Sequence, residues 1–510
     1  MKQTLDVVIL KPSKYGPDGY VERFLKGFMP NSTVPYIRSM TPDVVDSVLI
    51  NTHSIDEYVQ TDLAYLDLLK NPATPTLLAV VGAQSHQFQR SLDLAALARE
   101  SGVQNCVIGG PHAMTCDTSM LQNRGVSFAL AEAETIWPTI LRDAIRGQLQ
   151  PVYGAAQRWA KELDAPVLIP PSREALRRYV VPMLGIYPAR GCPFTCNFCS
   201  VIKIAGRQIR SQSVETTMAS LRAAKTAKIR MVAFVSDNAN KYAEIEELLE
   251  QMIAEQINIP FFVQCDTQIS KDENLVRLLG RAGCFQMFVG VESFRRDVLL
   301  AAHKTQNHPS QYKNIVRLCR ENGITTHFSN IIGFPGQSRQ DILDHNRILR
   351  EIDPDIVSFY ILCPIPGTAQ YDEFLAEGRI TEPNLDRFDA TTLTWKHDLS
   401  STELDDLLFE SYRRFYSLPH LGATMLRRFG RNKFDSICLQ GGAFQIFNRF
   451  MGHKHIHPMS GGVWRIRLDS AADYRALRRK HFGYDLVPLP KSLALSATDA
   501  ELNRRVKSAL

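Results

Sequence analysis

Short apolar segments alternate with amphipathic segments along two long stretches of this 510-residue chain. In the first stretch, residues 4–150, the expected strands are Leu5–Leu10, Val44–Ile50, Thr76–Val81, Asn105–Ile108 and Val126–Leu130. Between them, apolar residues recur three and four positions apart, which predicts helices such as Asp62–Lys70 and Leu92–Ser101. This alternation favours a parallel sheet with helices on both faces, and such a sheet binds its ligands at the carboxyl ends of its strands.

The alternation restarts after a connector at 151–180 that is rich in proline and charge. The six strands expected there are 181–188, 230–236, 260–266, 285–292, 325–333 and 356–363. They are separated by expected helices such as Tyr242–Glu255, Asn274–Ala282, Tyr312–Asn322 and Gln340–Glu351. Six strand–helix units in series predict a (β/α)6 barrel of the TIM type, partial or closed, with its chemistry in the loops after the strands.

The chain is therefore expected to be an α/β protein of three regions, because 510 residues exceed the usual size of one core. A doubly wound, Rossmann-like sheet is expected at 1–150, a linker at 151–180, the barrel at 181–384 and a mainly helical region at 385–510. In the last region the helices expected are Ser401–Ser417 and Leu421–Gly430.

Composition excludes several classes of protein. Hydrophobic residues make up 45% and charged residues 22%, which excludes a disordered chain. The net charge of +6 is small for this length and does not indicate a nucleic-acid partner. The N-terminal apolar run is too short for a secretory signal, and no stretch approaches 18 apolar residues. We therefore expect a cytoplasmic protein without a membrane span, whose ten cysteines are thiols or metal ligands.

Three cysteines lie close together directly after the first of the six later strands, in the segment Tyr187-Pro-Ala-Arg-Gly-Cys192-Pro-Phe-Thr-Cys196-Asn-Phe-Cys199-Ser. Thiolates are the ligands that iron–sulfur clusters prefer. Three of them on one loop can bind three irons of a cubane and leave the fourth iron open to a substrate. A structural zinc site is the alternative, but it would want a fourth Cys or His nearby, and 186–210 contains none.

The Cys-x3-Cys-x2-Cys spacing, with Phe198 before the third cysteine, resembles the radical S-adenosylmethionine superfamily. The resemblance implies that Cys192, Cys196 and Cys199 hold a [4Fe–4S] cluster. The open iron of that cluster would bind S-adenosylmethionine and cleave it to a 5′-deoxyadenosyl radical.

Polar residues and glycines at the ends of the following strands extend this resemblance. Ser236-Asp237-Asn238 stands where the family has a Gly-Gly-Glu turn. This departure leaves Asp237 as the best acceptor for the ammonium group of S-adenosylmethionine. Gly333 would let the backbone approach the adenine closely. The residues assigned in this way to S-adenosylmethionine are Phe198, Ser236, Asp237, Asn238, Gln264, Asp266, Glu292, Gly333 and Pro335. Each of them has a plain structural alternative as a strand-end cap.

The N-terminal region resembles the cobalamin-binding module that one branch of this superfamily carries. The resemblance covers residues 4–417, includes the segments Cys363–Thr368 and Arg387–His397, and assigns Gly109, Gly110, Pro111, His112, Glu132 and Glu134 to cobalamin. The Asp-x-His-x-x-Gly motif that supplies an axial histidine elsewhere is absent, and Ala-Glu-Ala-Glu replaces the usual Gly-Glu-Gly-Glu. The alternative is a doubly wound domain that has lost its cofactor.

Two features of the C-terminal region have open functions. Aromatic and basic residues interleave over 412–454, which suits either a helical cap on the barrel or a surface that receives an apolar or anionic substrate. His453, His455 and His457 would share a face in an extended strand and could then bind a metal, although a polar loop is the simpler expectation.

The function predicted from these features is cobalamin-dependent methyl transfer to an unactivated carbon by radical chemistry. One alternative keeps the radical but replaces methylation with cyclisation, oxidation or rearrangement, and another is a non-catalytic redox or cobalamin sensor. The expected partners are a small-molecule or lipid substrate and an electron donor such as flavodoxin or ferredoxin. No catalytic side chain is assigned.

Overall fold

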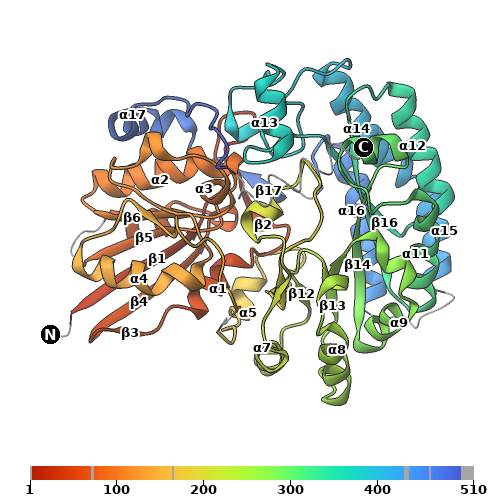
Figure 1. Cartoon of the computed structure of the whole chain (residues 1–510), viewed down its shortest axis with the longest axis horizontal. Helices are drawn as coiled ribbons and strands as arrows, with labels where there is room; N and C mark the ends of the chain where they lie inside the picture. The colour runs from red at the N-terminus through yellow and green to blue at the C-terminus, as the bar shows by residue number, and fades with distance from the viewer. Residues whose placement is uncertain (1–2, 71–73, 164–165, 430–435, 459–460, 495–510) are drawn as a thin grey trace.

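The computed structural model describes the chain except for residues 1–2, 71–73, 164–165, 430–435, 459–460 and 495–510. Two mainly parallel sheets lie next to each other, the N-terminal one at the left and the second one at the right in Figure 1. Helices cover both sheets, as the alternating sequence pattern predicts, so the expected α/β class is confirmed. Among the described residues, no helix has the length and apolar character needed to cross a membrane.

Seven strands form the N-terminal sheet in the order β3-β4-β1-β5-β6-β7-β8. Their bounds are β1 Thr4–Lys11, β3 Val44–Val45, β4 Val48–Asp56, β5 Thr76–Val80, β6 Asn105–Gly109, β7 Ser127–Ala129 and β8 Val152–Tyr153. Neighbouring strands pair in parallel, except that β3 runs antiparallel to β4. Without β3 and β8 this is the flavodoxin-like strand order, whose ligand crevice lies at the carboxyl ends.

The two faces of this sheet are buried by different helices, because side chains alternate along each strand. Val8 and Leu10 of β1 pack in the core that also holds α2 (Phe88–Glu100). Val7 and Ile9 face the other way, toward α1 (Thr33–Ser39) and α4 (Ala133–Arg146). The sheet is therefore doubly wound, as predicted.

One segment predicted as a single strand is divided into two strands by a turn. Val44–Ile50 was predicted as a single strand, but Asp46 and Ser47 adopt left-handed backbone conformations with φ of 46° and 69°. They form a tight turn between β3 and β4, and β4 continues to Asp56. Similarly, Asp62–Lys70 forms a shorter 3-10 helix, Ala64–Leu69.

The second sheet has six parallel strands in the order β16-β15-β14-β13-β12-β9. Their bounds are β9 Leu184–Ile186, β12 Val232–Phe234, β13 Phe261–Cys265, β14 Cys284–Glu292, β15 Thr325–Ile332 and β16 Ile356–Ile361. The helices between them are α7 Val214–Thr226, α8 Ile245–Ala254, α9 Glu273–Ala282, α10 Arg296–Ala301, α11 Tyr312–Glu321 and α12 Arg339–Ile352. The predicted (β/α)6 unit is thus a partial, open barrel, with β9 and β16 as its edges in the described part of the chain.

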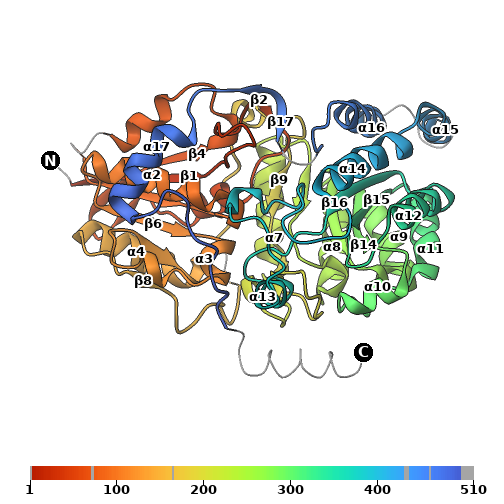
Figure 2. The same ribbon diagram turned by 90° about the horizontal axis from the view of Figure 1, so that it is seen from above.

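The free edge of the barrel is covered by α14 (Ser401–Phe415). The backbone N–H of Val357 donates to the Tyr416 hydroxyl at 2.9 Å, and that of Phe359 donates to the Tyr412 hydroxyl at 3.1 Å. These two tyrosines satisfy backbone donors that an edge strand otherwise leaves free for pairing with another chain. Two further helices, α15 (Leu418–Phe429) and α16 (Ser436–His453), continue this layer, as Figure 2 shows.

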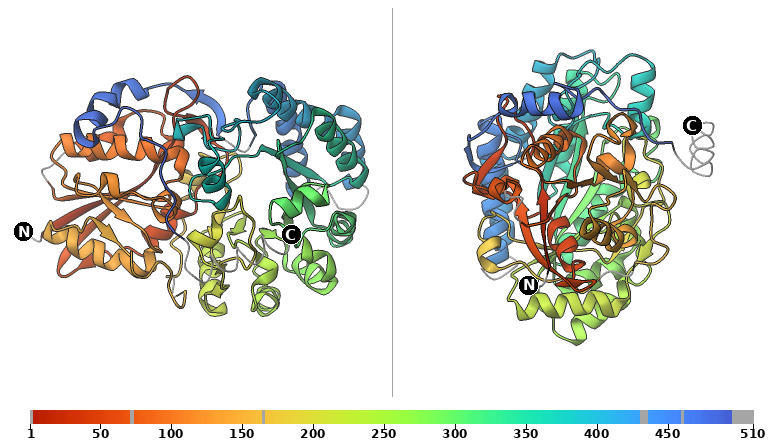
Figure 3. Two further views of the ribbon diagram at one scale, coloured as in Figure 1. Left: turned by 45° about the horizontal axis from the view of Figure 1, so that its top comes forward. Right: turned by 90° about the vertical axis from the view of Figure 1, so that its left-hand side faces the viewer.

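The segment 462–482 returns to the N-terminal region, which the sequence pattern did not indicate. Strand β17 (Gly462–Ile466) pairs antiparallel with β2 (Arg23–Gly27), and α17 (Ala471–Phe482) packs on α2. Figure 3 shows this segment lying over the N-terminal region rather than the barrel. The described residues after 385 therefore divide between the barrel and the N-terminal region.

A buried ion network joins this returning segment to the N-terminal region. Arg23 forms ion pairs with Asp469 and Glu57, and Arg90 binds the same two carboxylates. The Tyr65 hydroxyl accepts a hydrogen bond from Arg23 at 2.6 Å. Both arginines are 0% exposed, so each depends on these partners to offset the loss of water.

We predict that Asp469→Asn loosens the returning segment. The substitution leaves Arg23 and Arg90 with one buried carboxylate between them, at a cost of about 3–5 kcal/mol in the free energy of unfolding. Limited proteolysis should then cut the chain faster between α16 and α17. The control is Asp485→Asn, because Asp485 pairs with Arg479 in solvent. Equal cleavage rates in the two variants would contradict the prediction.

Candidate active site between the two sheets

The three motif cysteines lie on a loop whose base is closed by a two-stranded hairpin. β10 (Ala189–Arg190) pairs with β11 (Arg210–Ser211), and the Cys192 N–H donates to the Gly206 carbonyl at 3.1 Å. Gly191 allows this closure, because its φ is 106° and a Cβ there would lie 2.3 Å from the Gln208 carbonyl oxygen. The loop therefore leaves β9 and returns to the same point before α7 begins.

The three motif thiols are half-buried and close enough to influence each other's charge. Burial, and then the neighbouring thiols, raise the pKa of Cys192 to about 11 and that of Cys199 to about 12. Metal ligation would therefore release protons from these groups at neutral pH. Within the described ranges, no three His, Cys, Asp or Glu side chains converge on a point that would suit a single ion. Three cysteines on one loop are the number of protein ligands that a [4Fe–4S] cluster with one open iron would take.

Two residues beside the thiols were not found by sequence reasoning. The Gln306 amide donates a hydrogen bond to Cys196 Sγ at 3.7 Å. The Lys304 ammonium lies 5.7 Å from the centre of the Phe198 ring and donates to Glu292 Oε1 at 2.9 Å. Both come from the loop after α10, and no motif marks them. The positive charge of Lys304 and the amide of Gln306 therefore lie near the sulfurs of the predicted cluster ligands.

The turn after β12 lies against the cysteine loop. The Gly191 N–H donates to Asp237 Oδ2 at 2.9 Å, and the Ala189 N–H donates to the Ser236 hydroxyl at 3.3 Å. Burial raises the pKa of Asp237, whose carboxylate lines a cavity described below. Asn238 points elsewhere and exchanges hydrogen bonds with Asp266 at 2.7 and 2.9 Å.

The other residues predicted to contact S-adenosylmethionine are dispersed along the barrel. Gln264 is half-buried on β13, and Glu292 is buried at the end of β14 with Lys304 as its partner. At Gly333 the space for a side chain is filled by Leu404 of α14, so helix packing accounts for this glycine. Pro335 is exposed. The expected approach of the backbone to adenine at Gly333 therefore has no support from these contacts.

A cavity of about 300 Å³ opens at the carboxyl end of the N-terminal sheet, against the cysteine loop. Gly109, Gly110 and Pro111 line it, as predicted. Most of its wall is apolar and comes from β5, β6, β7, α1 and α4, and Tyr187, Arg190 and Asp237 line the barrel side. The cavity thus lies between the two parts that the sequence assigned to different cofactors.

Two of the predicted cobalamin residues, Gly110 and His112, have different surroundings from those expected. The His112 ring is 1% exposed and stacks on Phe88, with 3.8 Å between ring centres, so it is a core histidine that does not line the cavity. Burial lowers its pKa to about 3. At Gly110 a Cβ would lie 2.3 Å from the Ala83 nitrogen, so the close neighbour of this glycine is the chain itself.

Glu132 and Glu134 serve as ion-pair partners of the cysteine loop. Glu132 binds Arg210 through two oxygens at 2.6 and 2.8 Å and Arg190 at 3.3 Å. Glu134 pairs with Arg190 at 2.9 Å and accepts a hydrogen bond from Tyr36. Both carboxylates line the edge of the cavity, but their charge is already neutralised by arginines. This pairing gives Arg210 a structural role at the base of the cysteine loop.

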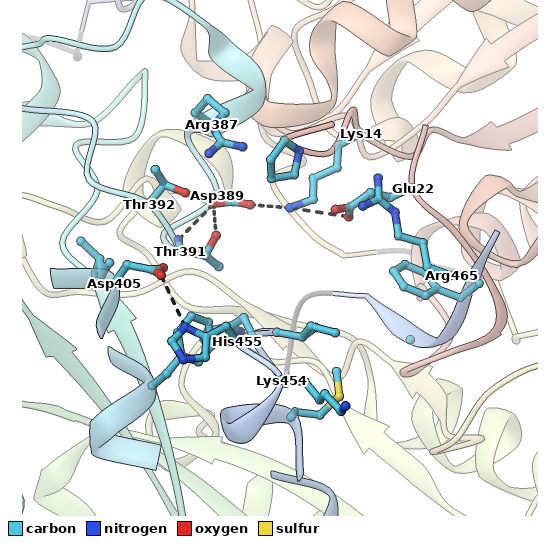
Figure 4. Close-up of a pocket in the computed structure, with 18 of the residues that line it drawn as sticks. Lys14, Glu22, Arg387, Asp389, Thr391, Thr392, Asp405, Lys454, His455 and Arg465 are labelled. Carbon is cyan, nitrogen blue, oxygen red and sulfur yellow. Dashed lines mark hydrogen bonds and ion pairs between the residues drawn. The ribbon is translucent and has the colours of Figure 1, made fainter. Parts of the chain in front are cut away.

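A larger cavity of about 910 Å³ lies near the carboxyl ends of β1 and β16 (Figure 4). Its lining comes from the loop after β1, the segment 386–392, α14, the end of α16 and β17. His455 and His457 belong to it, whereas His453 does not. His453 ends a helix, and His457 Nε2–H donates to the Phe359 carbonyl at 2.7 Å, so the three histidines do not share a strand face.

An open β/α barrel with a three-cysteine loop after its first strand, joined to a doubly wound sheet, defines the class of radical S-adenosylmethionine enzymes. Residues 186–349 match the family model described as the radical SAM superfamily. The barrel of this chain therefore matches the radical SAM superfamily, and the chain is an enzyme.

Comparison with individual proteins extends the similarity beyond the barrel. The chain is 25% identical over 344 residues to bacteriochlorophyllide d C-8(2)-methyltransferase of Chlorobaculum tepidum, covering 65% of this chain and 75% of that one. It is 22% identical over 417 residues to the anaerobic magnesium-protoporphyrin IX monomethyl ester cyclase of Rubrivivax gelatinosus, covering 80% and 67%. Its fold matches the methyltransferase TsrM of Kitasatospora setae, solved with cobalamin and a [4Fe-4S] cluster, with a TM-score of 0.60 and 13% identity. That match covers 89% of this chain and 99% of TsrM. The fold also matches the cobalamin-dependent S-adenosylmethionine radical enzyme OxsB, with a TM-score of 0.58 and 15% identity. That match covers 89% of this chain and 72% of OxsB.

The pKa of a carboxyl group in the lining of the larger cavity provides a pH test of this region. Burial raises the pKa of Asp386 to about 7, against about 3.9 in an unfolded chain. Between these values the folded protein binds a proton that the unfolded chain releases, so stability falls as pH rises through this window and levels off above pH 7.

We therefore predict that Asp386→Asn gains stability relative to the parent protein as pH increases. The gain between pH 5 and pH 8 should be about 2 kcal/mol, because one pKa unit corresponds to about 1.4 kcal/mol. The asparagine oxygen can still accept the hydrogen bond that Gln89 donates at 2.8 Å. The measurement is urea unfolding at several pH values, with the exposed Asp485→Asn as control. A difference that stays constant with pH would exclude this assignment.

Proposed function

We propose that the protein is a cobalamin-dependent radical S-adenosylmethionine methyltransferase that acts on an unactivated carbon. The observation that carries this proposal is the cavity between the N-terminal sheet and the cysteine loop. Its walls include Gly109 to Pro111 from one side and Arg190 and Asp237 from the other. Arg190 stands two residues before Cys192, so a ligand in this cavity would lie next to the loop of the proposed cluster.

Cys192, Cys196 and Cys199 are the proposed ligands of a [4Fe–4S] cluster. Their thiols are free, half-buried and on one closed loop, which fits three ligands of an open cubane. Such a cluster would supply one electron for cleavage of S-adenosylmethionine to a 5′-deoxyadenosyl radical. Lys304 and the Gln306 amide would offset negative charge on the sulfurs, because a positive charge and hydrogen bonds to sulfur stabilise the reduced state.

Residues of the barrel would hold S-adenosylmethionine beside that cluster. Asp237 faces the cavity with a carboxylate that accepts a hydrogen bond from Gly191, and it is the proposed acceptor for the ammonium. Asn238 and Asp266 are locked to each other and would present fixed oxygens to hydroxyl groups. Glu292 is paired with Lys304, so its proposed role is to position that lysine.

Cobalamin is the proposed occupant of the 300 Å³ cavity, at least through part of its nucleotide tail. The cavity is lined largely by apolar side chains, including Trp137 and Tyr36, which suits a flat heterocyclic group. No histidine lines it, so the protein offers no axial imidazole there among the described residues. Bound methylcobalamin would supply a methyl group to a substrate radical.

Named relatives support methyl transfer, and one of them also supports radical cyclisation as an alternative reaction. Named relatives include the bacteriochlorophyllide d C-8(2)- and C-12(1)-methyltransferases and a hopanoid C-2 methylase. The cyclase of Rubrivivax gelatinosus aligns with 80% of this chain, which favours radical cyclisation or oxidation as the alternative. In either case the reaction would need one electron at a time, so a flavodoxin or ferredoxin is the proposed donor.

We predict that Ala129→Trp abolishes retention of cobalamin but not of the cluster. Ala129 is 8% exposed and lines the cavity, so an indole there would fill the proposed tail site. The measurement is the visible spectrum after anaerobic reconstitution with iron, sulfide and hydroxocobalamin, followed by desalting. Ala129→Ser is the matched control and should retain about one corrin per chain. Retention of corrin by both variants would remove cobalamin from this cavity.

We also predict which products form from S-adenosylmethionine carrying a deuterated methyl group. A methyltransferase should yield S-adenosylhomocysteine and a labelled methylcobalamin, together with 5′-deoxyadenosine. A cyclase or oxidase should yield 5′-deoxyadenosine and methionine but no S-adenosylhomocysteine. Cys199→Ala should lower 5′-deoxyadenosine to background, whereas Cys106→Ala, a buried cysteine outside the motif, should not. Mass spectrometry distinguishes these outcomes without knowledge of the substrate.

A further inference from the structure

The larger cavity has a shape and position that neither proposed cofactor accounts for. It occupies about 910 Å³ and is bounded by segments from both ends of the chain, as Figure 4 shows. Ile361, the last residue of β16, lies in its wall, so the cavity meets the carboxyl end of the barrel. Chemistry in such barrels takes place at this end of the strands.

One wall carries charges that are already paired with each other. The Lys14 ammonium binds the Asp389 carboxylate and lies 3.7 Å from Glu22. Asp389 also accepts hydrogen bonds from the Thr391 N–H at 3.0 Å and from its hydroxyl at 2.7 Å. These residues form a rigid polar wall with little net charge to offer a ligand.

Two cations in the lining form no ion pair. Among the residues that the structure describes, none lies within ion-pair distance of Arg387 or Lys454, and no side-chain hydrogen bond to either group is present. Arg387 is half-buried with the Asp405 carboxylate as a charged neighbour, and the Lys454 ammonium lies 5.8 Å from the centre of the Phe450 ring. An anionic ligand would give the half-buried guanidinium the direct hydrogen bonds that no described side chain supplies.

Burial acts on the carboxyl groups in the lining. It raises the pKa of Asp386 to about 7 and raises the pKa of Glu22 as well. Burial also raises the pKa of Asp405, which faces His455 at 3.9 Å. These shifts favour the neutral form of each group and so reduce the repulsion of an anionic ligand.

Aromatic side chains also line the cavity, and some of them are open to solvent. The aromatic residues in the lining are Tyr15, Phe24, Phe409, Phe447, Phe450 and Trp464. Phe450 is 57% exposed and Trp464 is 69% exposed. Large apolar side chains that are exposed around a cavity with few unpaired polar groups are typical of a site for an apolar ligand.

We propose that this cavity binds an amphipathic organic anion, with its apolar body on the aromatic side chains and its anionic group at Arg387, and with Lys454 as a second cation of the lining. This inference rests on the proposed function, because such a molecule would be the substrate of that enzyme. The binding chemistry itself can be tested without cofactors or turnover.

The test compares two fluorescent probes that share one apolar body. 1-Anilinonaphthalene-8-sulfonate carries an anionic sulfonate, and N-phenyl-1-naphthylamine lacks it. We expect Arg387→Gln to weaken binding of the sulfonate about tenfold and to leave the neutral probe unchanged, since one charge-assisted hydrogen bond is lost. Lys454→Gln should have the same direction and a smaller size, because this lysine is more exposed. Phe450→Ala should weaken both probes.

The matched control is Arg347→Gln, since Arg347 lies on the outer helix α12 and pairs with Glu351 in solvent. It should leave both probes unchanged. Unchanged sulfonate binding in Arg387→Gln would overturn anion recognition. Equal weakening of both probes by that variant would make Arg387 a structural residue only, and no effect of Phe450→Ala would place the probes outside the cavity. Loss of S-adenosylmethionine cleavage in a separate assay would overturn the proposed function and leave these binding results intact.

Discussion

The ion pairs between Glu132, Arg190 and Arg210 are the interaction on which the arrangement of the molecule depends. They connect the loop after β7 of the N-terminal sheet with both strands of the hairpin that closes the cysteine loop. Glu132 and Arg210 are 6% and 8% exposed, so their attraction acts in a medium of low dielectric constant. Arg210 also donates to the Ala160 and Ala205 carbonyls at 2.7 Å, which satisfies the rest of its guanidinium. The carboxyl ends of the two sheets are held against each other by these contacts.

This joint determines what the space between the sheets can be used for. Arg190 is held by Glu134 on one side and stacks near Tyr36 and Tyr187 on the other, with 5.1 and 5.2 Å to the ring centres. Its side chain therefore forms a fixed wall between the smaller cavity and the cysteine loop. A group bound in that cavity and a group bound on the loop would therefore be neighbours without any closing movement of the N-terminal sheet and the barrel.

The fold could be predicted where the local pattern of apolar residues decides the structure. The alternation indicated most strands of both sheets, and the spacing of Cys192, Cys196 and Cys199 indicated the site. The pairing of Glu132 with Arg210 spans 78 residues, and nothing in either segment marks the other. Lys304 and Gln306 reach the cysteines only because α10 ends beside them, and the return of β17 to β2 depends on tertiary contacts. His112 followed a recognisable motif, but its ring entered the core because Phe88 offers a stacking surface there.

The ion pair between Arg23 and Asp469 spans 446 residues, and this separation has a consequence for synthesis of the chain. The N-terminal sheet is made first, yet Arg23 and Arg90 wait for a carboxylate that is made near the end. Strand β2 likewise waits for its partner β17, and until then it presents an unpaired edge. Closing a loop of this length early has a large entropic cost, and contacts of such high sequence separation form late in folding. The N-terminal unit therefore completes its folding only after the barrel has left the ribosome, and the nascent chain must be protected from aggregation during that interval.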